Sequence, residues 1–226
     1  MSSLVDTSVF GLYEIFSNII PGFIVLVTLW EFVESVLHVQ TTIIDSSIFP
    51  VFFVFLSFIL GVAIQAASAP FEKFVFRISH GGYPSSTLLD EADKTFPDDF
   101  KKSIRRLSHE KLGIPRDSDC QHIFDLCYTY VVQNNISKRV STFLNMYSFS
   151  RNMSVAMLLE AVVLFIWARL ASSSLILALG VLSALLAILF YNRFMRYSRS
   201  FSTEVFRSFY IDQTKRETTS GKSKPH

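Results

Sequence analysis

Residues 153–191 read MSVAMLLEAVVLFIWARLASSSLILALGVLSALLAILFY, and the two apolar runs in this stretch decide the fold class. The first run covers residues 153–168 and the second covers residues 175–191, and the turn between them carries one cation, Arg169. A helix needs about 20 apolar residues to cross the hydrocarbon core of a bilayer. Both runs approach that length, so the stretch predicts a transmembrane helical hairpin.

Two earlier apolar runs, residues 15–33 and residues 48–67, predict a second hairpin. The chain is 50% hydrophobic with a mean hydropathy of +0.37, and the grouping of its apolar residues into four blocks excludes an ordinary soluble domain. We therefore predict an all-α fold: a polytopic membrane protein with four transmembrane helices and a small helical cytoplasmic domain. Because no basic residue precedes the first run, we expect a spanning helix there rather than a signal peptide, with a break near Pro21.

The cationic residues are distributed unevenly along the chain. None of the 21 Lys and Arg residues precedes Lys73, twelve lie in residues 70–152, one is Arg169, and eight lie in residues 193–226. Cationic side chains bias the loops that carry them to remain in the cytoplasm. We therefore expect a multi-pass protein of the cell inner membrane, with both termini and the long central segment on the cytoplasmic side.

The predicted spans divide the chain into four parts. We expect an N-terminal segment with the first hairpin in residues 1–69, a cytoplasmic helical domain in residues 70–152, the second hairpin in residues 153–192, and a cytoplasmic basic tail in residues 193–226. In the central domain, DDFKKSIRRLSHEKLG begins with two acids and ends at a glycine, which predicts a helix. IFDLCYTYVV has helical apolar spacing, with a strand over YTYVV as the alternative, and ISKRVSTFLNMYSF is expected to continue into the third span.

The basic tail begins with a stretch in which cations alternate with aromatic and aliphatic side chains, YNRFMRYSRSFSTEVFRSFY. This pattern predicts an amphipathic helix on the cytoplasmic membrane surface, where its cations would bind anionic lipid headgroups. Lipid is therefore the expected partner of the stretch, and nucleic acid is not. The following residues, TKRETTSGKSKPH, lack apolar side chains and are expected to be disordered. The cations expected at the headgroups are Arg193, Arg196, Arg199 and Arg207.

One acidic residue, Glu160, lies inside the third predicted span. An isolated charge in the hydrocarbon core is costly, so such residues usually face a bundle interior or a water-filled cavity. Two roles remain open for Glu160: a hydrogen-bonded contact that holds helices together, and a pore or relay function. Gln65 and Asn18 are the polar companions that we expect near it.

Small residues recur four positions apart in two of the predicted spans. Ala63 with Ala67, and Gly180 with Ala184, have the spacing that allows close helix packing, within one chain or between copies. Four helices with one intramembrane acid cannot enclose a wide aqueous path alone. Any conduction would therefore require a homo-oligomer.

We expect no metal site, no cofactor and no enzymatic activity. His109, Cys120, His122 and Cys127 are potential zinc ligands, but their spacing matches no established zinc motif. In a reducing cytoplasm the two cysteines are also not expected to form a disulfide. Arg116 and His122 have the loose Arg–His spacing of the HEPN ribonucleases, for which chance alone predicts about 0.8 matches in this chain.

Three short blocks of the chain, EIFSNIIPGFIVL, IFDLCYTYVV and FLNMYSFSRN, carry a resemblance. Together they resemble blocks of small four-span prokaryotic membrane proteins, some of which are similar to membrane components of anti-phage defence systems. The resemblance implies an oligomer in which a cytoplasmic part senses a signal and a membrane part responds. It carries over no functional residue.

Two classes of function therefore remain. In the first, the chain is an oligomeric membrane effector or sensor: its cytoplasmic domain receives a soluble protein or a small signalling molecule, and its spans alter membrane permeability. In the second, it is a non-conducting scaffold that recruits a soluble cytoplasmic partner to the membrane.

Overall fold

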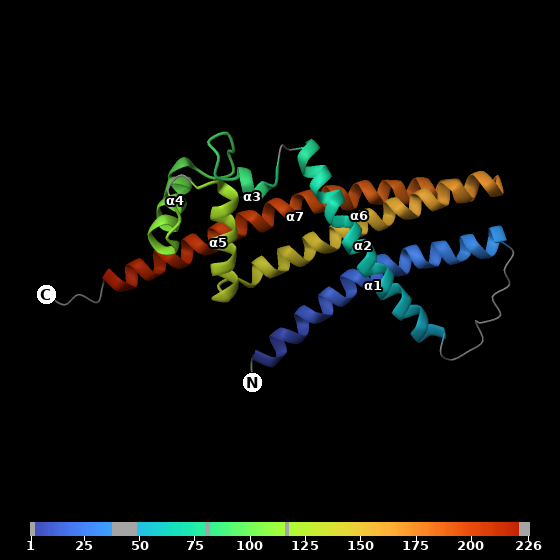
Figure 1. Cartoon of the computed structure of the whole chain (residues 1–226), viewed down its shortest axis with the longest axis horizontal. Helices are drawn as coiled ribbons and strands as arrows, with labels where there is room; N and C mark the ends of the chain where they lie inside the picture. The colour runs from blue at the N-terminus through green and yellow to red at the C-terminus, as the bar shows by residue number, and fades with distance from the viewer. Residues whose placement is uncertain (1–2, 38–48, 80–81, 116–117, 222–226) are drawn as a thin grey trace. The chain divides into compact units, whose positions relative to one another are not determined.

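The computed structural model describes residues 3–37, 49–79, 82–115 and 118–221, and every regular element within these ranges is an α-helix (Figure 1). The prediction of an all-α fold is therefore confirmed for this part of the chain. The helices are α1 (Ser3–Leu37), α2 (Phe49–Ser79), α3 (Pro84–Thr87), α4 (Asp98–Leu112), α5 (Cys120–Gln133), α6 (Lys138–Ala171) and α7 (Ser174–Gly221).

Four of these helices are long and apolar enough to cross a membrane. The qualifying stretches are Ile15–Val36 in α1, Phe49–Ile78 in α2, Lys138–Ala171 in α6 and Ser174–Thr218 in α7. Each of the four predicted spans lies in one of them, apart from residue 48, which lies outside the described residues, so the prediction of four candidate transmembrane helices is confirmed by length and composition. Large apolar side chains stand exposed along these helices, such as Val51, which a hydrocarbon environment would cover.

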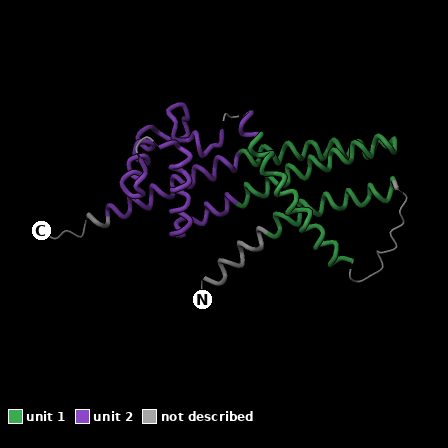
Figure 2. The backbone as a smooth tube through the Cα atoms, in the orientation of Figure 1, with its two compact units in different colours: residues 1–74, 145–195 green, residues 75–144, 196–226 purple. Residues whose placement is uncertain are grey.

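The chain forms two compact units, which Figure 2 shows in different colours. Unit 1 consists of residues 1–74 and 145–195, and unit 2 consists of residues 75–144 and 196–226. The last part of α7 thus belongs to the same unit as the central segment, whereas the sequence divided them into separate parts. Three helices, α2, α6 and α7, contribute residues to both units.

Within unit 1, α1 and α2 come into direct backbone contact. A Cβ atom added to Gly22 would lie 1.9 Å from the carbonyl oxygen of Ser57, and one added to Gly61 would lie 1.9 Å from the carbonyl oxygen of Asn18. Only glycine fits at either position. The predicted break near Pro21 is wrong, because α1 continues through it; a helix among other helices tolerates the loss of one backbone hydrogen bond.

Unit 2 is built on short helices whose ends the sequence marks well. Helix α4 ends at Gly113, which adopts a left-handed conformation with φ of 70°, as expected for a C-terminal glycine. Helix α5 begins after Asp119, whose side chain accepts a hydrogen bond of 2.7 Å from the backbone N–H of His122. The strand alternative for YTYVV is wrong, because those residues lie within α5.

The core of unit 2 contains apolar side chains from α4, α5 and α7. Val205, Phe206 and Phe209 of α7 are fully buried in it. The apolar side chains that we expected on the membrane surface are therefore covered by protein, because α4 and α5 supply an apolar face of their own. Residues 214–221 continue α7, so the prediction of disorder is wrong for them, and residues 222–226 lie outside the described residues.

Candidate functional site

The carboxyl group of Glu160 joins three helices of unit 1. Its Oε1 atom accepts a hydrogen bond of 3.1 Å from the hydroxyl of Thr28 in α1, and its Oε2 atom accepts one of 2.7 Å from the hydroxyl of Ser183 in α7. Thr28 and Ser183 are buried, and Glu160 in α6 is half-buried. One carboxyl thus holds α1 and α7 against α6.

Each of the two hydroxyls has a second acceptor within reach. Thr28 Oγ1 lies 3.1 Å from the carbonyl oxygen of Ile24, and Ser183 Oγ lies 3.0 Å from the carbonyl oxygen of Met157. A hydroxyl has one hydrogen, so each side chain can donate either to Glu160 or to the backbone carbonyl beside it. That carbonyl belongs to Ile24 for Thr28 and to Met157 for Ser183. The site therefore has alternative hydrogen-bond arrangements that require no movement of the helices.

Neither of the polar companions expected for Glu160 contacts it. The side chain of Gln65 is exposed on α2, and its backbone carbonyl accepts a hydrogen bond of 2.7 Å from Ser68. Asn18 is buried at the contact between α1 and α2, and its Oδ1 atom has no hydrogen-bond partner among the described residues. The actual partners are the hydroxyl groups of Thr28 and Ser183, each of which lies in a long apolar stretch of its span, and these isolated hydroxyls were the signal that the sequence offered.

Of the small residues at four-residue spacing, Gly180 of α7 lies against α6, whereas the two of α2 are exposed. A Cβ atom on Gly180 would lie 3.0 Å from the ring of Phe165, and Ala184 is partly buried. Ala63 and Ala67 are exposed. A direct backbone contact between two helices lies instead at Gly22 and Gly61, a pair that the four-residue spacing rule cannot find because its members lie on different helices.

A second polar network in unit 1 joins α2 to α6. Arg151 lies 2.6 Å from Glu72 through its Nη1 and Oε2 atoms, and the hydroxyl of Tyr147 donates to the other carboxyl oxygen of Glu72. The guanidinium of Arg151 also lies over the ring of Tyr147, 5.8 Å from its centroid. Glu72 and Arg151 are largely buried. From the sequence, Arg151 was expected only as one of the cytoplasmic cations, and no local pattern pairs it with Glu72.

Buried polar atoms without partners lie beside this network. Ser68 donates a hydrogen bond of 3.0 Å to Oδ1 of Asn152, while Nδ2 of Asn152 has no partner within the part of the chain that the structure describes. In the same part of the chain, the Oγ atom of Ser150 and the Nε atom of Arg151 are also buried without a hydrogen bond. A buried polar atom without a hydrogen bond lowers the free energy of unfolding. We therefore infer that these atoms reduce the stability of unit 1 beside the Glu72–Arg151 pair.

The arginines predicted to bind lipid headgroups differ in their surroundings. Arg199 donates to Asp93 at 3.0 Å, and the guanidinium of Arg207 lies 5.9 Å from the ring centroid of Phe96. Burial alone would raise the pKa of Asp93, but the hydrogen bonds from Thr95 and the charge of Arg199 outweigh it and hold the pKa below its ordinary value. The side chains of Arg193 and Arg196 are exposed.

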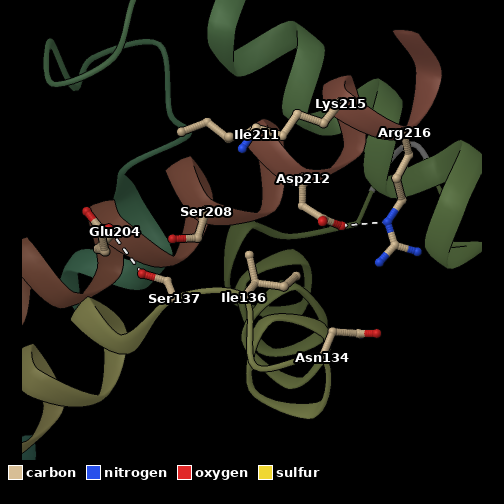
Figure 3. Close-up of a pocket in the computed structure, with 9 residues that line it drawn as sticks. All are labelled: Asn134, Ile136, Ser137, Glu204, Ser208, Ile211, Asp212, Lys215 and Arg216. Carbon is tan, nitrogen blue, oxygen red and sulfur yellow. Dashed lines mark hydrogen bonds and ion pairs between the residues drawn. The ribbon is translucent and has the colours of Figure 1, made fainter. Parts of the chain in front are cut away.

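Unit 2 has a pocket of about 380 Å³ between the α5–α6 connection and α7 (Figure 3). The connection contributes Asn134, Ile136 and Ser137. One end of the α7 wall has Glu204, and the other has Asp212 with the cations Lys215 and Arg216. Asp212 accepts a hydrogen bond of 2.8 Å from Tyr130 and forms an ion pair with Arg216 at 2.9 Å, and burial together with the Asp212 contact raises the pKa of Tyr130.

The potential metal ligands of unit 2 have other contacts. Nδ1 of His109 lies 2.8 Å from the carbonyl oxygen of Ile114, and the thiol of Cys120 donates to the carbonyl oxygen of Ser85 at 3.0 Å. Burial raises the pKa of Cys120 to about 11 and that of Cys127 to about 12. Within the described residues, no three His, Cys, Asp or Glu side chains gather as a metal site would require. Arg116 of the HEPN-like pair lies outside those residues.

We compared the chain with models of protein families, with curated proteins and with solved structures, and none of them matches it.

Proposed function

We propose that this chain is an oligomeric inner-membrane effector or sensor, in which unit 2 receives a cytoplasmic signal and the bundled spans respond by altering membrane permeability. The observation that carries the proposal is the contact of Glu160 with Thr28 and Ser183. It places a carboxyl group, whose two hydroxyl donors can turn instead to backbone carbonyls, at the meeting point of three candidate spans.

The charge distribution supports a cytoplasmic location for unit 2. Of the 21 Lys and Arg residues, all but Arg169 lie in or beside residues 70–152 and 193–226, and these segments supply nearly all of unit 2. By the positive-inside rule, both termini are then cytoplasmic, and the exposed Arg193 and Arg196 are suited to contact anionic headgroups. A signal from within the cell would therefore reach unit 2 directly.

The helices shared by the two units supply a physical route for coupling. α6 has 34 residues and α7 has 48, and each contributes to both units. A helix transmits a rotation or a shift along its axis better than a loop does. A ligand that changes the packing of α7 in unit 2 would therefore bias the position of Ser183, and with it the hydrogen bonds of Glu160.

Oligomer formation is part of the proposal because four helices are too few to enclose a wide aqueous path. The exposed Ala63 and Ala67 give α2 a face of small residues that a second copy could approach closely. The resemblance to membrane components of anti-phage defence systems fits the same role, and a soluble cytoplasmic protein or a small signalling molecule is the proposed partner.

Reconstitution of the full chain tests the proposal. The mass of the protein in nanodiscs reports the number of copies, and release of potassium from liposomes reports permeability. We expect more than one copy per assembly and a release rate above that of protein-free liposomes. A monomer that leaves the liposomes sealed, also when cytoplasmic extract is added as a source of the signal, would contradict the proposal.

The alternative function is a non-conducting scaffold that recruits a soluble partner. One observation favours it: both carboxyl oxygens of Glu160 are hydrogen-bonded within a single chain, as a purely structural contact requires. The two functions differ in their response to Glu160→Gln. A scaffold keeps its recruiting activity in this variant, because an amide still bridges the two hydroxyls, whereas the effector changes its permeability.

A further inference from the structure

One end of the pocket in unit 2 brings an acid and two hydroxyl groups together. Glu204 and Ser208 are four residues apart on α7, so their side chains lie on the same face of the helix, one turn from each other. Ser137 of the α5–α6 connection lies beside them, because its hydroxyl donates a hydrogen bond of 3.4 Å to Oε1 of Glu204 (Figure 3). We call these three side chains the acidic end of the pocket.

Ser208 has unused hydrogen-bonding capacity. The residue is only 6% exposed, its side chain lines the pocket, and its hydroxyl makes no hydrogen bond to any described residue. By contrast, Ser202, Thr203 and Thr214 of the same helix each donate to a backbone carbonyl four residues earlier. A buried hydroxyl without a partner is costly, so Ser208 is suited to bind a polar group that enters the pocket.

The carboxylate of Glu204 also has capacity for a ligand. Within the described residues it accepts the one long hydrogen bond from Ser137 and forms no ion pair, and the residue is half-buried. A carboxylate has about four lone-pair sites, so most of its accepting capacity stays unused. The hydroxyl of Ser137 donates to Glu204 and can still accept a hydrogen bond. The acidic end therefore offers three acceptor groups and one negative charge.

This combination matches a primary ammonium group. An ammonium has three N–H donors and no acceptor, so it can bond to all three side chains of the acidic end at once. The neighbouring lining is apolar. Ile136 directly precedes Ser137 in the chain, and Ile211 lies about 4.5 Å beyond Ser208 along α7. An aliphatic stem that carries the ammonium would pack against these two isoleucines.

Other common ligands fit the pocket less well. A diamine would place its second ammonium at the other end, where the acid Asp212 already binds Tyr130 and Arg216. A metal ion would need both acids of the lining, but Glu204 and Asp212 are eight residues apart on α7, a rise of about 12 Å. Recognition of a nucleobase depends largely on stacking against aromatic rings, and none of the nine lining residues is aromatic.

We propose that the acidic end of this pocket binds a primary ammonium group on a single aliphatic stem, the chemistry of a lysine side chain or of a free alkylamine. The pocket volume of about 380 Å³ lies in the lower part of the range of about 300 to 1,000 Å³ that is usual for ligand sites, which suits a ligand of this size. The inference rests on the proposed function and deepens it, because it names the chemistry of the signal that unit 2 receives.

The test uses the full chain in nanodiscs of zwitterionic lipid and lysine with both backbone ends blocked, N-acetyl-lysine N-methylamide. The matched ligand is the norleucine derivative, which keeps the stem and lacks the ammonium. Binding is measured by ligand-observed NMR, with protein-free nanodiscs as the blank. We expect the lysine derivative to bind at least about threefold more tightly, because only an ammonium gains charge-assisted hydrogen bonds at this partly exposed site.

A second probe, pentylammonium, distinguishes the two sources of the ammonium group. Tighter binding of the lysine derivative than of pentylammonium would support a protein side chain as the source, and the reverse would support a free amine. If neither probe binds, or if the norleucine derivative binds as tightly as the lysine derivative does, the proposal is overturned.

Substitutions locate the binding to the acidic end. Glu204→Gln keeps the size of the side chain and removes its charge, so the preference for the ammonium probes should disappear. Ser208→Ala should weaken these probes about three- to tenfold and leave the norleucine derivative unchanged. Glu110→Gln, which removes an exposed acid of α4 outside the pocket, is the matched control and should leave binding unchanged. An ammonium preference that survives in Glu204→Gln would contradict the assignment.

A charge reversal separates loss of the site from loss of the fold. Glu204→Lys should bind the N-acetyl-glutamate N-methylamide in preference to the lysine derivative, a result that simple destabilisation cannot produce. Unchanged preference for the lysine derivative in this variant would also contradict the assignment.

Failure of this inference can be distinguished from failure of the proposed function. Ammonium binding is measured in nanodiscs, whereas permeability is measured in liposomes with the same protein. Binding that depends on Glu204 while the liposomes remain sealed would leave the ammonium site established and overturn the effector function. Release of potassium without ammonium binding would do the opposite.

Discussion

Ser183 of α7 donates a hydrogen bond of 2.7 Å to the Oε2 atom of Glu160 in α6. Thr28 of α1 donates a hydrogen bond of 3.1 Å to the other carboxyl oxygen, Oε1. The only acid that the sequence places inside the third span is thus held from two sides, by hydroxyls that lie far away in the sequence.

The hydroxyl of Thr28 should contribute measurably to the stability of unit 1. We expect Thr28→Val to lower the free energy of unfolding by about 0.5 to 2 kcal/mol, the range found for hydrogen bonds between membrane helices. Thr28→Ser keeps the hydroxyl and is the matched control, with the smaller loss that one methyl group causes. Unfolding in detergent micelles measures both variants, and equal losses for Val and Ser would refute a role for the hydroxyl.

The contact of α1 with α2 should tolerate no side chain at Gly61. A Cβ atom there would lie 1.9 Å from a backbone oxygen of Asn18, and backbone cannot move aside as a flexible side chain can. We expect Gly61→Ala to cost more than about 3 kcal/mol or to separate the two helices. Gly180→Ala is the control, because its Cβ atom would meet side-chain atoms rather than backbone, namely the ring of Phe165 at 3.0 Å and the Cβ atom of Leu164 at 3.3 Å, and it should cost about 1 kcal/mol. Similar thermal midpoints for the two variants would contradict this packing.

Glu72 and Arg151 form a buried ion pair, so removal of one charge should destabilise the fold by leaving the other charge buried without a partner. Arg151→Met leaves the carboxylate of Glu72 without its cation and should lower the free energy of unfolding by about 3 kcal/mol. Adding Glu72→Gln should restore part of this loss, because the amide still accepts from Tyr147 and carries no charge. Lys73→Met, an exposed neighbour, is the control. Additive effects in the double variant would argue against a coupled pair.

The thiol of Cys127 should react slowly in the folded protein. Burial raises its pKa from an ordinary 9.0 to about 12, so the reactive thiolate is suppressed. In a Cys120→Ser background, we expect alkylation by iodoacetamide at pH 8.5 to be more than about a hundredfold slower in the folded than in the unfolded chain. Because the folded pKa is raised, this group stabilises the fold fully below pH 9, and the contribution is lost as the pH rises toward 12. Equal alkylation rates in the two states would show that Cys127 is not buried.

Local patterns predicted the helices well. The four spans follow from the length of their apolar runs, and the end of α4 follows from Gly113, because both signals involve residues that are close in sequence. The importance of Glu160 was also predictable, since an acid in an apolar span needs a partner. The identity of that partner was not, because it depends on which faces of α1, α6 and α7 meet.

Long-range packing explains the other differences. Val205 and Phe206 belong to an apolar face of α7 that would suit either a membrane surface or a protein core. Because α4 and α5 present apolar faces of their own, the two side chains pack into a core. The pair of Glu72 and Arg151 was missed for a similar reason. Each charge alone looks like part of a cytoplasmic loop, and only the alignment of α2 with α6 brings them together.

The most direct test of the proposed function is potassium release from liposomes that contain the full chain at increasing protein-to-lipid ratios. An oligomeric effector predicts a release rate that rises more steeply than the amount of protein, because several copies form one path, and a changed rate for Glu160→Gln at equal insertion. A rate that stays at the level of protein-free liposomes at every ratio, for both the wild type and Glu160→Gln, would contradict the account and favour the scaffold.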